Sequence, residues 1–589
     1  MTVDAVNRGQ TTLSPIDRVE DAFRRIAEVD RPEVWITLRP VADVHADAVA
    51  VQARLDAGER LPLAGKVVAV KDNIDVAGLP TSAACPEFVY LPDVTATAVR
   101  RLVEQGAVVL GKTNLDQFAT GLVGTRSPYG AVRCSWDPER VSGGSSSGSA
   151  VAVALGIADI GIGTDTAGSG RVPAAFNGLV GIKATLGVIP ADGVVPACVD
   201  YDCVTVFATE LDTAVTAARI MSGPATADPR SRAWPSDVRL AAPAQPRVAI
   251  PTKADLALLT PQYRAAFDAT VTSVTDRGFA VEAVDISPLL EAARLLYDGA
   301  VVAERYTAVG QFLDTAPAGA DPVVTAIVES ARKPAGHEFA ADLDTLARVK
   351  ARTRELLTGF DGLLLPTTTE HPTIAAVQAD PIQINRRMGT YTNFCNLLDM
   401  AAVAVPGVPT AAGDPFGVMV VVPAFADQVA VDLAARLVGV PAPALVEGGV
   451  ELAVFGAHLR GQPLHFQLED IGARFFGTVT TTDAYRLTAL ATTPPKPGLV
   501  RRGPGAGAEI AGELFRVSPA GLGTFLAALP APMALTSVEL SDGRVVVGFS
   551  CTHDAVDGAT DITEFGSWVA YLAAAASRPV STYQTAGGQ

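Results

Sequence analysis

The chain has 589 residues, of which 49% are hydrophobic and 19% are charged, and its net charge is −17 at pH 7. This composition excludes an intrinsically disordered chain, and the length exceeds that of one ordinary domain. The acidic balance argues against a nucleic-acid-binding surface. We therefore expect a soluble globular protein with two domains, one of them large.

Cysteine spacing and hydrophobic runs bear on metal sites and cellular compartment. The six cysteines show no CxxC spacing, so they indicate neither a zinc site nor a disulfide framework. The first 15 residues lack the pattern of a signal peptide, and no unbroken apolar run reaches about 18 residues. We expect a cytoplasmic protein without a membrane span, a metal or a cofactor.

Helical and strand-like segments alternate over the first three quarters of the chain. Ser14 and Pro15 open an amphipathic helix to about residue 28. The further elements expected are helices at about 41–57, 96–105, 262–277, 288–309 and 343–358, and strands at 66–70, 107–110, 247–250, 362–366 and 417–422. This alternation predicts an α/β sheet.

The composition changes near residue 440. We expect a first domain over residues 1–440, a linker at 441–448 that contains two prolines, and a second domain over 449–589. Short strands at 451–455, 475–481, 513–517 and 545–550 predict a compact α+β fold for the second domain. The Pro- and Gly-rich stretch 492–507 is expected to be a loop or hairpin tip.

Two Gly/Ser-rich loops, at 143–149 and 164–170, enclose an apolar run over 150–158. Such loops can be flexible linkers, but a linker does not normally lie between two segments with the character of buried structure. We interpret the loops as part of a site. Helix capping by the serines is the structural alternative.

Amide hydrolysis needs a nucleophile, a base for its proton, and donors for the oxyanion. None of the six histidines is close in sequence to either loop, although the fold could still bring one near. A Ser-Lys arrangement is the other solution, and Lys71 is its candidate base because it ends an apolar strand-like run. A salt bridge of Lys71 with Asp72 or Asp75 is the structural alternative.

The runs VKDN at 70–73, GGSSSGSA at 143–150 and GTDTAGSGR at 163–171 resemble the amidase signature family of Ser-cisSer-Lys hydrolases. The resemblance implies an α/β domain in which helices cover a mixed central sheet. It also implies that Ser169 is the nucleophile, that Ser145 relays its proton through a cis peptide, and that Lys71 is the base. Backbone N–H groups of Thr166, Ala167, Gly168 and Ser169 would form the oxyanion hole.

Further runs at 114–130, 163–178, 296–306 and 389–394 resemble the allophanate hydrolases within that family. The resemblance implies the small substrate allophanate and the products ammonia and carbon dioxide. Arg305 would pair with the substrate carboxylate, with Tyr297 and Gly121 as further binding residues. Tyr297 would lie two turns before Arg305 on one face of a helix. A surface Glu304/Arg305 pair and a core tyrosine are the structural alternative.

In the second domain, the runs 455–461 and 512–515 resemble the glycine-containing loop and the glutamate of γ-glutamyl cyclotransferase-like folds. In allophanate hydrolases this domain is implicated in decarboxylating N-carboxycarbamate. His458, His465 and Glu513 are the candidates on that interpretation, and the loop N–H groups would bind a carboxylate. Core or loop histidines and a strand-edge carboxylate are the alternatives.

The chain has no Met-Lys-Met biotin attachment site, so a biotin-dependent urea carboxylase would be a separate chain. A cyanuric-acid or biuret pathway is the other source of allophanate, and the chain could form a homodimer.

Two alternative functions are compatible with the sequence. One alternative is an amidase of another small amide, or an amidotransferase subunit of the glutamyl-tRNA type. The other is a second domain that acts only in oligomerisation or docking.

Overall fold

The computed structural model describes residues 13–577, which divide into two compact units. Unit 1 comprises the described residues up to Trp234 together with Gln245–Leu445, and unit 2 comprises Pro235–Ala244 and the described residues from Val446 onward. The sequence placed residues 235–244 in the first domain. They belong to unit 2 because the N–H of Leu240 donates to the carbonyl of Gly472 and the N–H of Ala520 donates to that of Ser236.

Unit 1 is built on a sheet of eleven strands in the order β1-β3-β2-β4-β6-β5-β10-β11-β9-β7-β8. Parallel pairs occur toward both ends, such as β2 with β4 and β7 with β9, and antiparallel pairs occupy the middle, so the sheet is mixed. The strands are β1 Trp35–Leu38, β2 Val67–Lys71, β3 Val108–Thr113, β4 Ile160–Asp165, β5 Val180–Lys183, β6 Cys203–Ala208, β7 Arg247–Pro251, β8 Ala280–Val284, β9 Gly362–Pro366, β10 Met400–Pro406 and β11 Gly417–Pro423.

Every residue of β2, β3 and β4 is buried, as expected for strands covered on both faces. Functional side chains at the ends of these strands therefore leave the sheet inside the protein rather than at its surface. Lys71 is the last residue of β2, and Asp165 is the last residue of β4.

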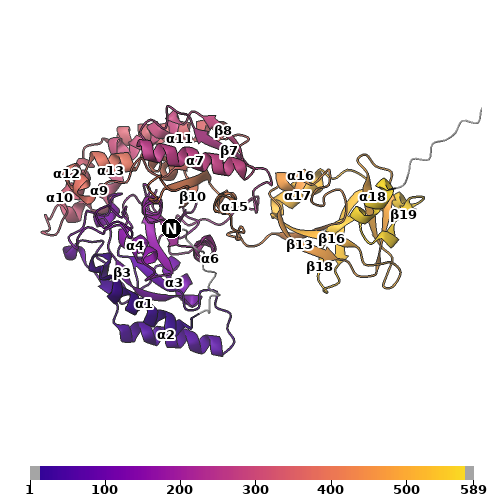
Figure 1. Cartoon of the computed structure of the whole chain (residues 1–589), viewed down its shortest axis with the longest axis horizontal. Helices are drawn as coiled ribbons and strands as arrows, with labels where there is room; N and C mark the ends of the chain where they lie inside the picture. The colour runs from indigo at the N-terminus through magenta and orange to yellow at the C-terminus, as the bar shows by residue number, and fades with distance from the viewer. Residues whose placement is uncertain (1–12, 578–589) are drawn as a thin grey trace, which may run out of the picture. The chain divides into compact units, whose positions relative to one another are not determined.

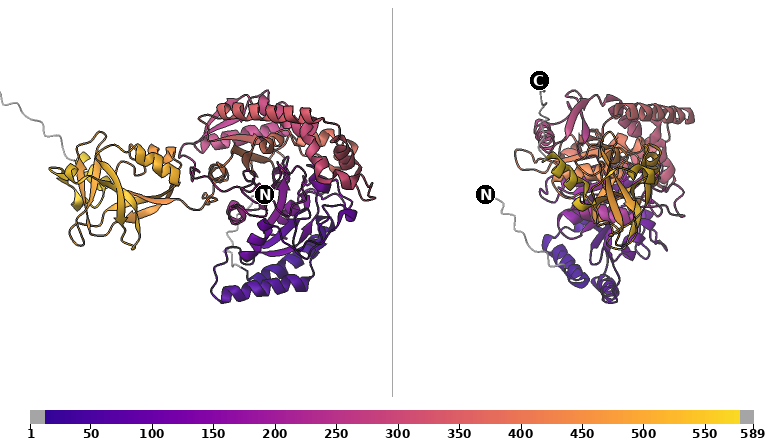
Figure 2. Two further views of the ribbon diagram at one scale, coloured as in Figure 1. Left: turned by 180° about the vertical axis from the view of Figure 1, so that it is seen from behind. Right: turned by 90° about the vertical axis from the view of Figure 1, so that its right-hand side faces the viewer.

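Helices pack along the sheet of unit 1 (Figures 1 and 2). α4 contacts β2, β4 and β6, α5 contacts β5, β10 and β11, and α1 lies beside α2. The helices are α1 Pro15–Val29, α2 Val41–Asp56, α3 Thr97–Glu104, α4 Ser147–Ala154, α5 Arg171–Phe176, α6 Leu211–Met221, α7 Pro261–Asp276, α8 Ser287–Asp298, α9 Ala303–Leu313, α10 Pro322–Ser330, α11 Gly336–Leu356, α12 Ile374–Ala379, α13 Gln383–Met388, α14 Asn393–Leu397 and α15 Asp427–Val438. Ser14 caps α1 by accepting a hydrogen bond from the N–H of Asp17, in agreement with the expected start.

The prediction of a single helix over 288–309 is wrong. α8 ends at Asp298, Gly299 is extended, and a short 3-10 turn at Ala300–Val302 leads into α9. The break is tolerated because the N–H of Ala300 donates to the carboxylate of Asp342 instead of to a carbonyl one turn earlier. Tyr297 and Arg305 consequently lie on two different helices.

Unit 2 contains a five-stranded sheet in the order β13-β16-β12-β18-β17 and a three-stranded sheet in the order β15-β14-β19. A core that includes Leu452, Phe515 and Trp568 lies within this unit. The elements are β12 Val450–Val454, α16 Phe466–Asp470, β13 Arg474–Thr480, β14 Tyr485–Leu490, β15 Lys496–Arg501, β16 Ala511–Val517, α17 Pro519–Ala527, β17 Met533–Glu539, β18 Val545–Cys551, β19 Thr560–Asp561 and α18 Trp568–Ala576.

The loop expected over 492–507 is wrong in part, because β15 lies inside it. Residues 496–500 of β15 are buried, and the strand pairs with β14 over six residues. Four prolines and four glycines in residues 492–507 hid the strand from prediction by sequence pattern. Within residues 13–577, no helix is long and apolar enough to cross a membrane.

Candidate active site

Lys71 and Ser145 are in direct contact inside unit 1. Lys71 Nζ lies 2.8 Å from Ser145 Oγ and 2.7 Å from Thr164 Oγ1, and all three side chains are buried. β2 brings Lys71 to this point, β4 brings Thr164, and the loop before α4 brings Ser145. The peptide bond between Gly144 and Ser145 is cis.

The environment of Lys71 favours a neutral amine. Burial lowers its pKa to about 7, although the carboxylates of Asp116, Asp202 and Asp165 act in the opposite direction. The expected alternative of a salt bridge to Asp72 or Asp75 is excluded, because Asp72 pairs with Lys112 at 3.4 Å and Lys71 has no ion pair with any residue in the described range.

The loop that contains Ser145 is held by the buried carboxylate of Asp116. This carboxylate accepts hydrogen bonds from the N–H groups of Val123, Gly124 and Arg126, and the N–H of Asp116 donates to the carbonyl of Ser145. A Cβ on Gly144 would lie 2.1 Å from Asp116 Oδ2, so only glycine fits before Ser145.

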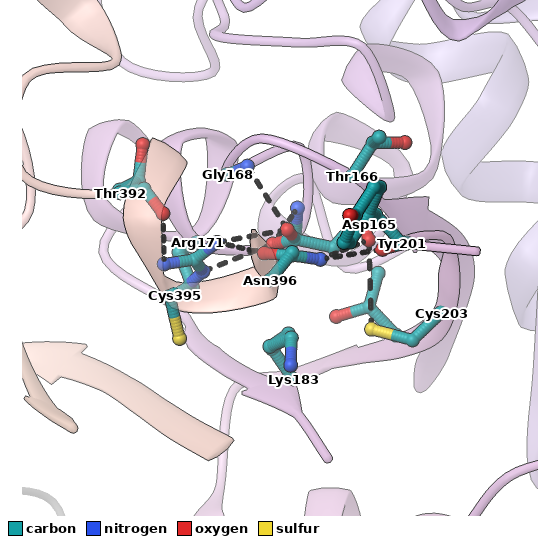
Figure 3. Close-up of polar contacts among 12 residues, drawn as sticks. Asp165, Thr166, Gly168, Arg171, Lys183, Tyr201, Cys203, Thr392, Cys395 and Asn396 are labelled. Carbon is teal, nitrogen blue, oxygen red and sulfur yellow. Dashed lines mark hydrogen bonds and ion pairs between the residues drawn. The ribbon is translucent and has the colours of Figure 1, made fainter. Parts of the chain in front are cut away.

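Asp165 organises the loop that contains Ser169 (Figure 3). Its carboxylate accepts hydrogen bonds from the N–H groups of Gly168 and Gly170, both at 2.9 Å, and forms an ion pair with Arg171. The guanidinium of Arg171 also donates to Asn396 Oδ1 at 2.9 Å. Burial opposes ionisation of Asp165, but Arg171 outweighs it and lowers the pKa of this carboxyl.

The expected set of oxyanion donors needs one correction. The N–H of Gly168 is already bound to Asp165 Oδ1, so it does not fit the role of a free donor. In contrast, no hydrogen bond within residues 13–577 uses the N–H of Thr166, Ala167 or Ser169, or the hydroxyl of Ser169. Three of the four expected donors therefore remain available around a buried serine.

Arg305 is buried, and most of its hydrogen-bonding capacity is unused. Nη1 donates to Thr120 Oγ1 at 2.8 Å, whereas Nε and Nη2 have no partner. Its guanidinium lies 4.8 Å from the centre of the Tyr297 ring, so the break between α8 and α9 still brings these two residues together. The expected alternative of a surface pair fails, because Arg305 is 1% exposed and Glu304 accepts instead from the N–H of Asp200.

A short path of contacts connects Arg305 to the serine loops. Thr120, the partner of Arg305, precedes Gly121, and a Cβ on Gly121 would lie 2.5 Å from Asp116 Oδ2. Asp116 in turn holds the loop of Ser145. Gly121 is thus required for close packing between the guanidinium and the Ser145 loop.

The three candidates of unit 2 lie around the loop that follows β12, and each has a partner within the protein. His458 is buried, its Nε2 lies 2.9 Å from Gln467 Oε1, and its ring stacks on Phe549. His465 Nδ1 lies 3.1 Å from the carbonyl of His458. Glu513 accepts hydrogen bonds from the backbone and guanidinium of Arg460, as expected of a strand carboxylate with a structural partner.

Sequence reasoning did not assign a role to Thr164, Asp116, Asp165 or Asp202. Thr166 Oγ1 donates to the carboxylate of Asp202, which also accepts from the N–H groups of Ala197 and Cys198. Asp116 and Asp165 fall within the motif runs, so their signal was present in the sequence. Within residues 13–577 no group of three or more His, Cys, Asp or Glu side chains could hold a metal ion.

Comparison with known proteins agrees with this geometry. Residues 17–431 match the family model described as amidase, and the chain therefore belongs to the amidase family. Residues 450–573 match the model described as allophanate hydrolase C-terminal domain, so the chain combines the two domains of an allophanate hydrolase-type amidase.

Solved and curated relatives extend over both units. The Kluyveromyces lactis allophanate hydrolase structure is 38% identical, covers 96% of this chain and 97% of its own, and has a TM-score of 0.86. The K. lactis urea amidolyase structure is 39% identical over 96% of this chain and 36% of its own, with a TM-score of 0.87. The Saccharomyces cerevisiae urea amidolyase is 40% identical over 96% of this chain, which spans about a third (32%) of that relative's length.

Proposed function

We propose that unit 1 hydrolyses allophanate to ammonia and N-carboxycarbamate. Allophanate carries one carboxylate and one terminal amide, so its binding requires a fixed cation at a set distance from a nucleophile. The observation that supports this substrate is Arg305, a buried guanidinium with two unpartnered nitrogens that can bind a planar carboxylate. The similarity to the K. lactis allophanate hydrolase over both units supports the same conclusion.

In the proposed mechanism a proton moves from Ser169 to Ser145 and from Ser145 to Lys71. Lys71 can accept it because burial lowers its pKa to about 7. Ser169 Oγ attacks the amide carbonyl, and the N–H groups of Thr166, Ala167 and Ser169 stabilise the oxyanion. The same path returns the proton to the leaving nitrogen, which departs as ammonia, and water then releases the acyl group from Ser169.

The bound substrate would extend from Arg305 to Ser169. Arg305 and Tyr297 hold the carboxylate end, and Gly121 follows Thr120 at the point where the backbone packs against Asp116. Asp165 and Arg171 contact no substrate in this arrangement. Their role is to fix the conformation of the loop that presents Ser169.

For unit 2 we propose a γ-glutamyl cyclotransferase-like fold that removes carbon dioxide from the N-carboxycarbamate. Support comes from the glycine-containing loop that follows β12 and from the buried ring of His458 at its end. Burial lowers the pKa of His458, so its imidazole is neutral near pH 7 and can exchange a proton with the nitrogen of the product.

The supply of allophanate is proposed to come from a urea carboxylase. The relatives named urea amidolyase are about three times as long as this chain, and this chain aligns with about a third of each.

The test compares ammonia release from fresh allophanate with that from glutamine and from simple aliphatic amides. We expect a kcat/KM for allophanate at least about 100-fold above those of the other amides, because only allophanate offers a carboxylate at the correct distance for Arg305. Equal turnover of an uncharged aliphatic amide would contradict the assignment of the substrate.

A further inference from the structure

Asp202 is a buried carboxylate that the proposed mechanism does not use. It lies directly before β6, at the end of the loop 197–202. Its Oδ1 accepts a hydrogen bond from Thr166 Oγ1, and its Oδ2 accepts one from the N–H of Ala197 at 2.8 Å. The backbone nitrogen of Cys198 lies 3.2 Å from both oxygens. Both oxygens therefore accept hydrogen bonds, which is the arrangement of an ionised carboxylate.

The hydrogen bond from Thr166 fixes the first donor of the proposed oxyanion hole. Thr166 is 2% exposed and directly follows β4, and no hydrogen bond within residues 13–577 uses its N–H. The N–H and the side chain of a residue are attached to the same Cα, so the bond to Asp202 restricts the direction in which this N–H points. An oxyanion donor is effective when its direction is set before the charge develops. Asp202 can therefore act on catalysis without contacting the substrate.

The loop 197–202 is joined to the start of the Ser169 loop by a second contact. Asn396 Nδ2 donates to the carbonyl of Asp165 at 2.7 Å and to the carbonyl of Tyr201 at 2.9 Å (Figure 3). One buried amide thus holds the residues that precede Thr166 and Asp202 at a fixed separation.

The other side of this loop contacts α9. The N–H of Asp200 donates to the carboxylate of Glu304 at 3.2 Å, and the next residue on the helix is Arg305. Burial raises the pKa of Asp202, while its hydrogen bonds and the charge of Arg305 lower it. Besides Lys71, the titratable and charged groups that interact electrostatically with Asp202 are Cys198 on its own loop and Glu304 and Arg305 on α9.

The charge of Asp202 also acts on the proposed base. Burial lowers the pKa of Lys71 to about 7, and the carboxylates of Asp116, Asp202 and Asp165 oppose this effect. Asp116 accepts hydrogen bonds from three backbone N–H groups, and Asp165 is paired with Arg171. Asp202 has no ion pair with any residue of the described chain, so no directly bound cation offsets its charge.

We propose that Asp202 is a positioning residue for the hydrolysis in unit 1, which sets the direction of the Thr166 N–H and supplies a negative charge near Lys71. The proposal rests on the proposed function of unit 1 and adds to it a group that touches no reacting atom. Loss of the Thr166 hydroxyl should then slow the chemical step. Loss of the charge should change the pH dependence of the reaction.

The test measures kcat, KM and the pH profile of kcat/KM for ammonia release from fresh allophanate by the full chain. Thr166→Val keeps the N–H and the shape of the side chain but removes the hydroxyl, so kcat should fall about tenfold with little change in KM or in the midpoint of the pH profile. Thr166→Ser, which retains a hydroxyl, should recover most of the lost kcat. Asp202→Asn should also lower kcat, and its midpoint should move down by about half a unit or more, because one negative charge no longer raises the pKa of Lys71.

Asp200→Asn is the matched control, because it removes an exposed carboxylate of the same loop that pairs with Arg230. Its kcat, KM and midpoint should equal those of the wild-type protein. The proposal is overturned if Thr166→Val keeps the wild-type kcat, a result that does not depend on the folding of Asp202→Asn. It is also overturned if Asp202→Asn is active with an unchanged midpoint, as expected of a residue that only stabilises the fold. Failure of the proposed function would appear separately, as a wild-type chain that releases no ammonia from allophanate.

Discussion

The base of the proposed mechanism is a lysine whose charge is suppressed by burial. Asp72, the carboxylate nearest to Lys71 in sequence, forms an ion pair with Lys112 instead. The amino group of Lys71 contacts Ser145 and Thr164. The position of Lys71 at the end of an apolar strand was readable from the sequence. The absence of an ion pair between Lys71 and Asp72 could not be predicted from the sequence. Lys112, which pairs with Asp72, lies on another strand and reaches it only in the folded sheet.

Activity should depend on the deprotonation of Lys71. Because its pKa is lowered to about 7, the neutral form that accepts a proton dominates above that pH and is lost below it. We expect kcat/KM for allophanate to fall about tenfold per pH unit below 7 and to level off above it. A pH profile of kcat/KM measures this, and a profile that is flat from pH 5.5 to 8 would remove Lys71 as the base.

Removing the nucleophile should abolish turnover without unfolding the protein. Ser169→Ala deletes a hydroxyl that makes no hydrogen bond within the described chain, so thermal stability should be nearly unchanged while kcat falls at least about 10³-fold. Ser169 is 2% exposed, and its replacement by the smaller alanine needs no rearrangement. Ammonia release at the wild-type rate would contradict the assignment.

Arg305→Lys should weaken substrate binding more than it slows the chemical step. Lysine keeps the charge but cannot pair with a carboxylate through two nitrogens, so we expect KM to rise about tenfold or more with a smaller change in kcat. Arg348→Gln on the exposed face of α11 is the control and should leave both constants unchanged. An effect of Arg305→Lys on melting temperature alone would indicate a structural residue.

At the scale of elements, the turn between β4 and α5 is fixed by the ion pair of Asp165 with Arg171, and Arg171 also donates to Asn396 of α14. Gly168 has φ +137°, and a Cβ there would lie 2.4 Å from Thr392 Oγ1. Gly168→Ala should therefore displace the turn and lower kcat about 10²-fold. Gly156→Ala is the matched control, because Gly156 also has positive φ but no atom within 4 Å of its added Cβ. Equal kcat in the two variants would show that the position of this turn is not critical.

Helices and strands were predicted correctly where the hydrophobic periodicity and the capping residues indicated the same element. The prediction failed where contacts between distant parts of the chain determine the element. The strands β2, β9 and β11 and the helices α1 and α2 were predicted from apolar runs and caps. The break at Gly299 was missed because it depends on Asp342 from a distant helix. β15 was missed because its pairing with β14 overrides the Pro and Gly in its surroundings.

At the scale of the whole molecule, the chain folds as two units, and the proposed function assigns one step of a two-step degradation to each. Each proposed site is built from residues of one unit: Lys71, Ser145, Ser169 and Arg305 in unit 1, and His458 in unit 2. We therefore expect the product of the first site to dissociate before the second site processes it. This order predicts that the two sites need not be on the same polypeptide.

An equimolar mixture of Ser169→Ala and His458→Ala chains tests that expectation. The first variant lacks the nucleophile of unit 1, and the second lacks the imidazole of unit 2. We expect the His458→Ala chain alone to release the first ammonia normally but to accumulate N-carboxycarbamate, observed by ¹³C NMR of labelled allophanate. Addition of the Ser169→Ala chain should remove that intermediate and restore carbon dioxide release to at least about half of the wild-type rate, because its unit 2 is intact. If the intermediate never accumulates in His458→Ala, unit 2 has no part in decarboxylation; if it accumulates and the mixture does not clear it, the product passes between units of one chain without entering solution.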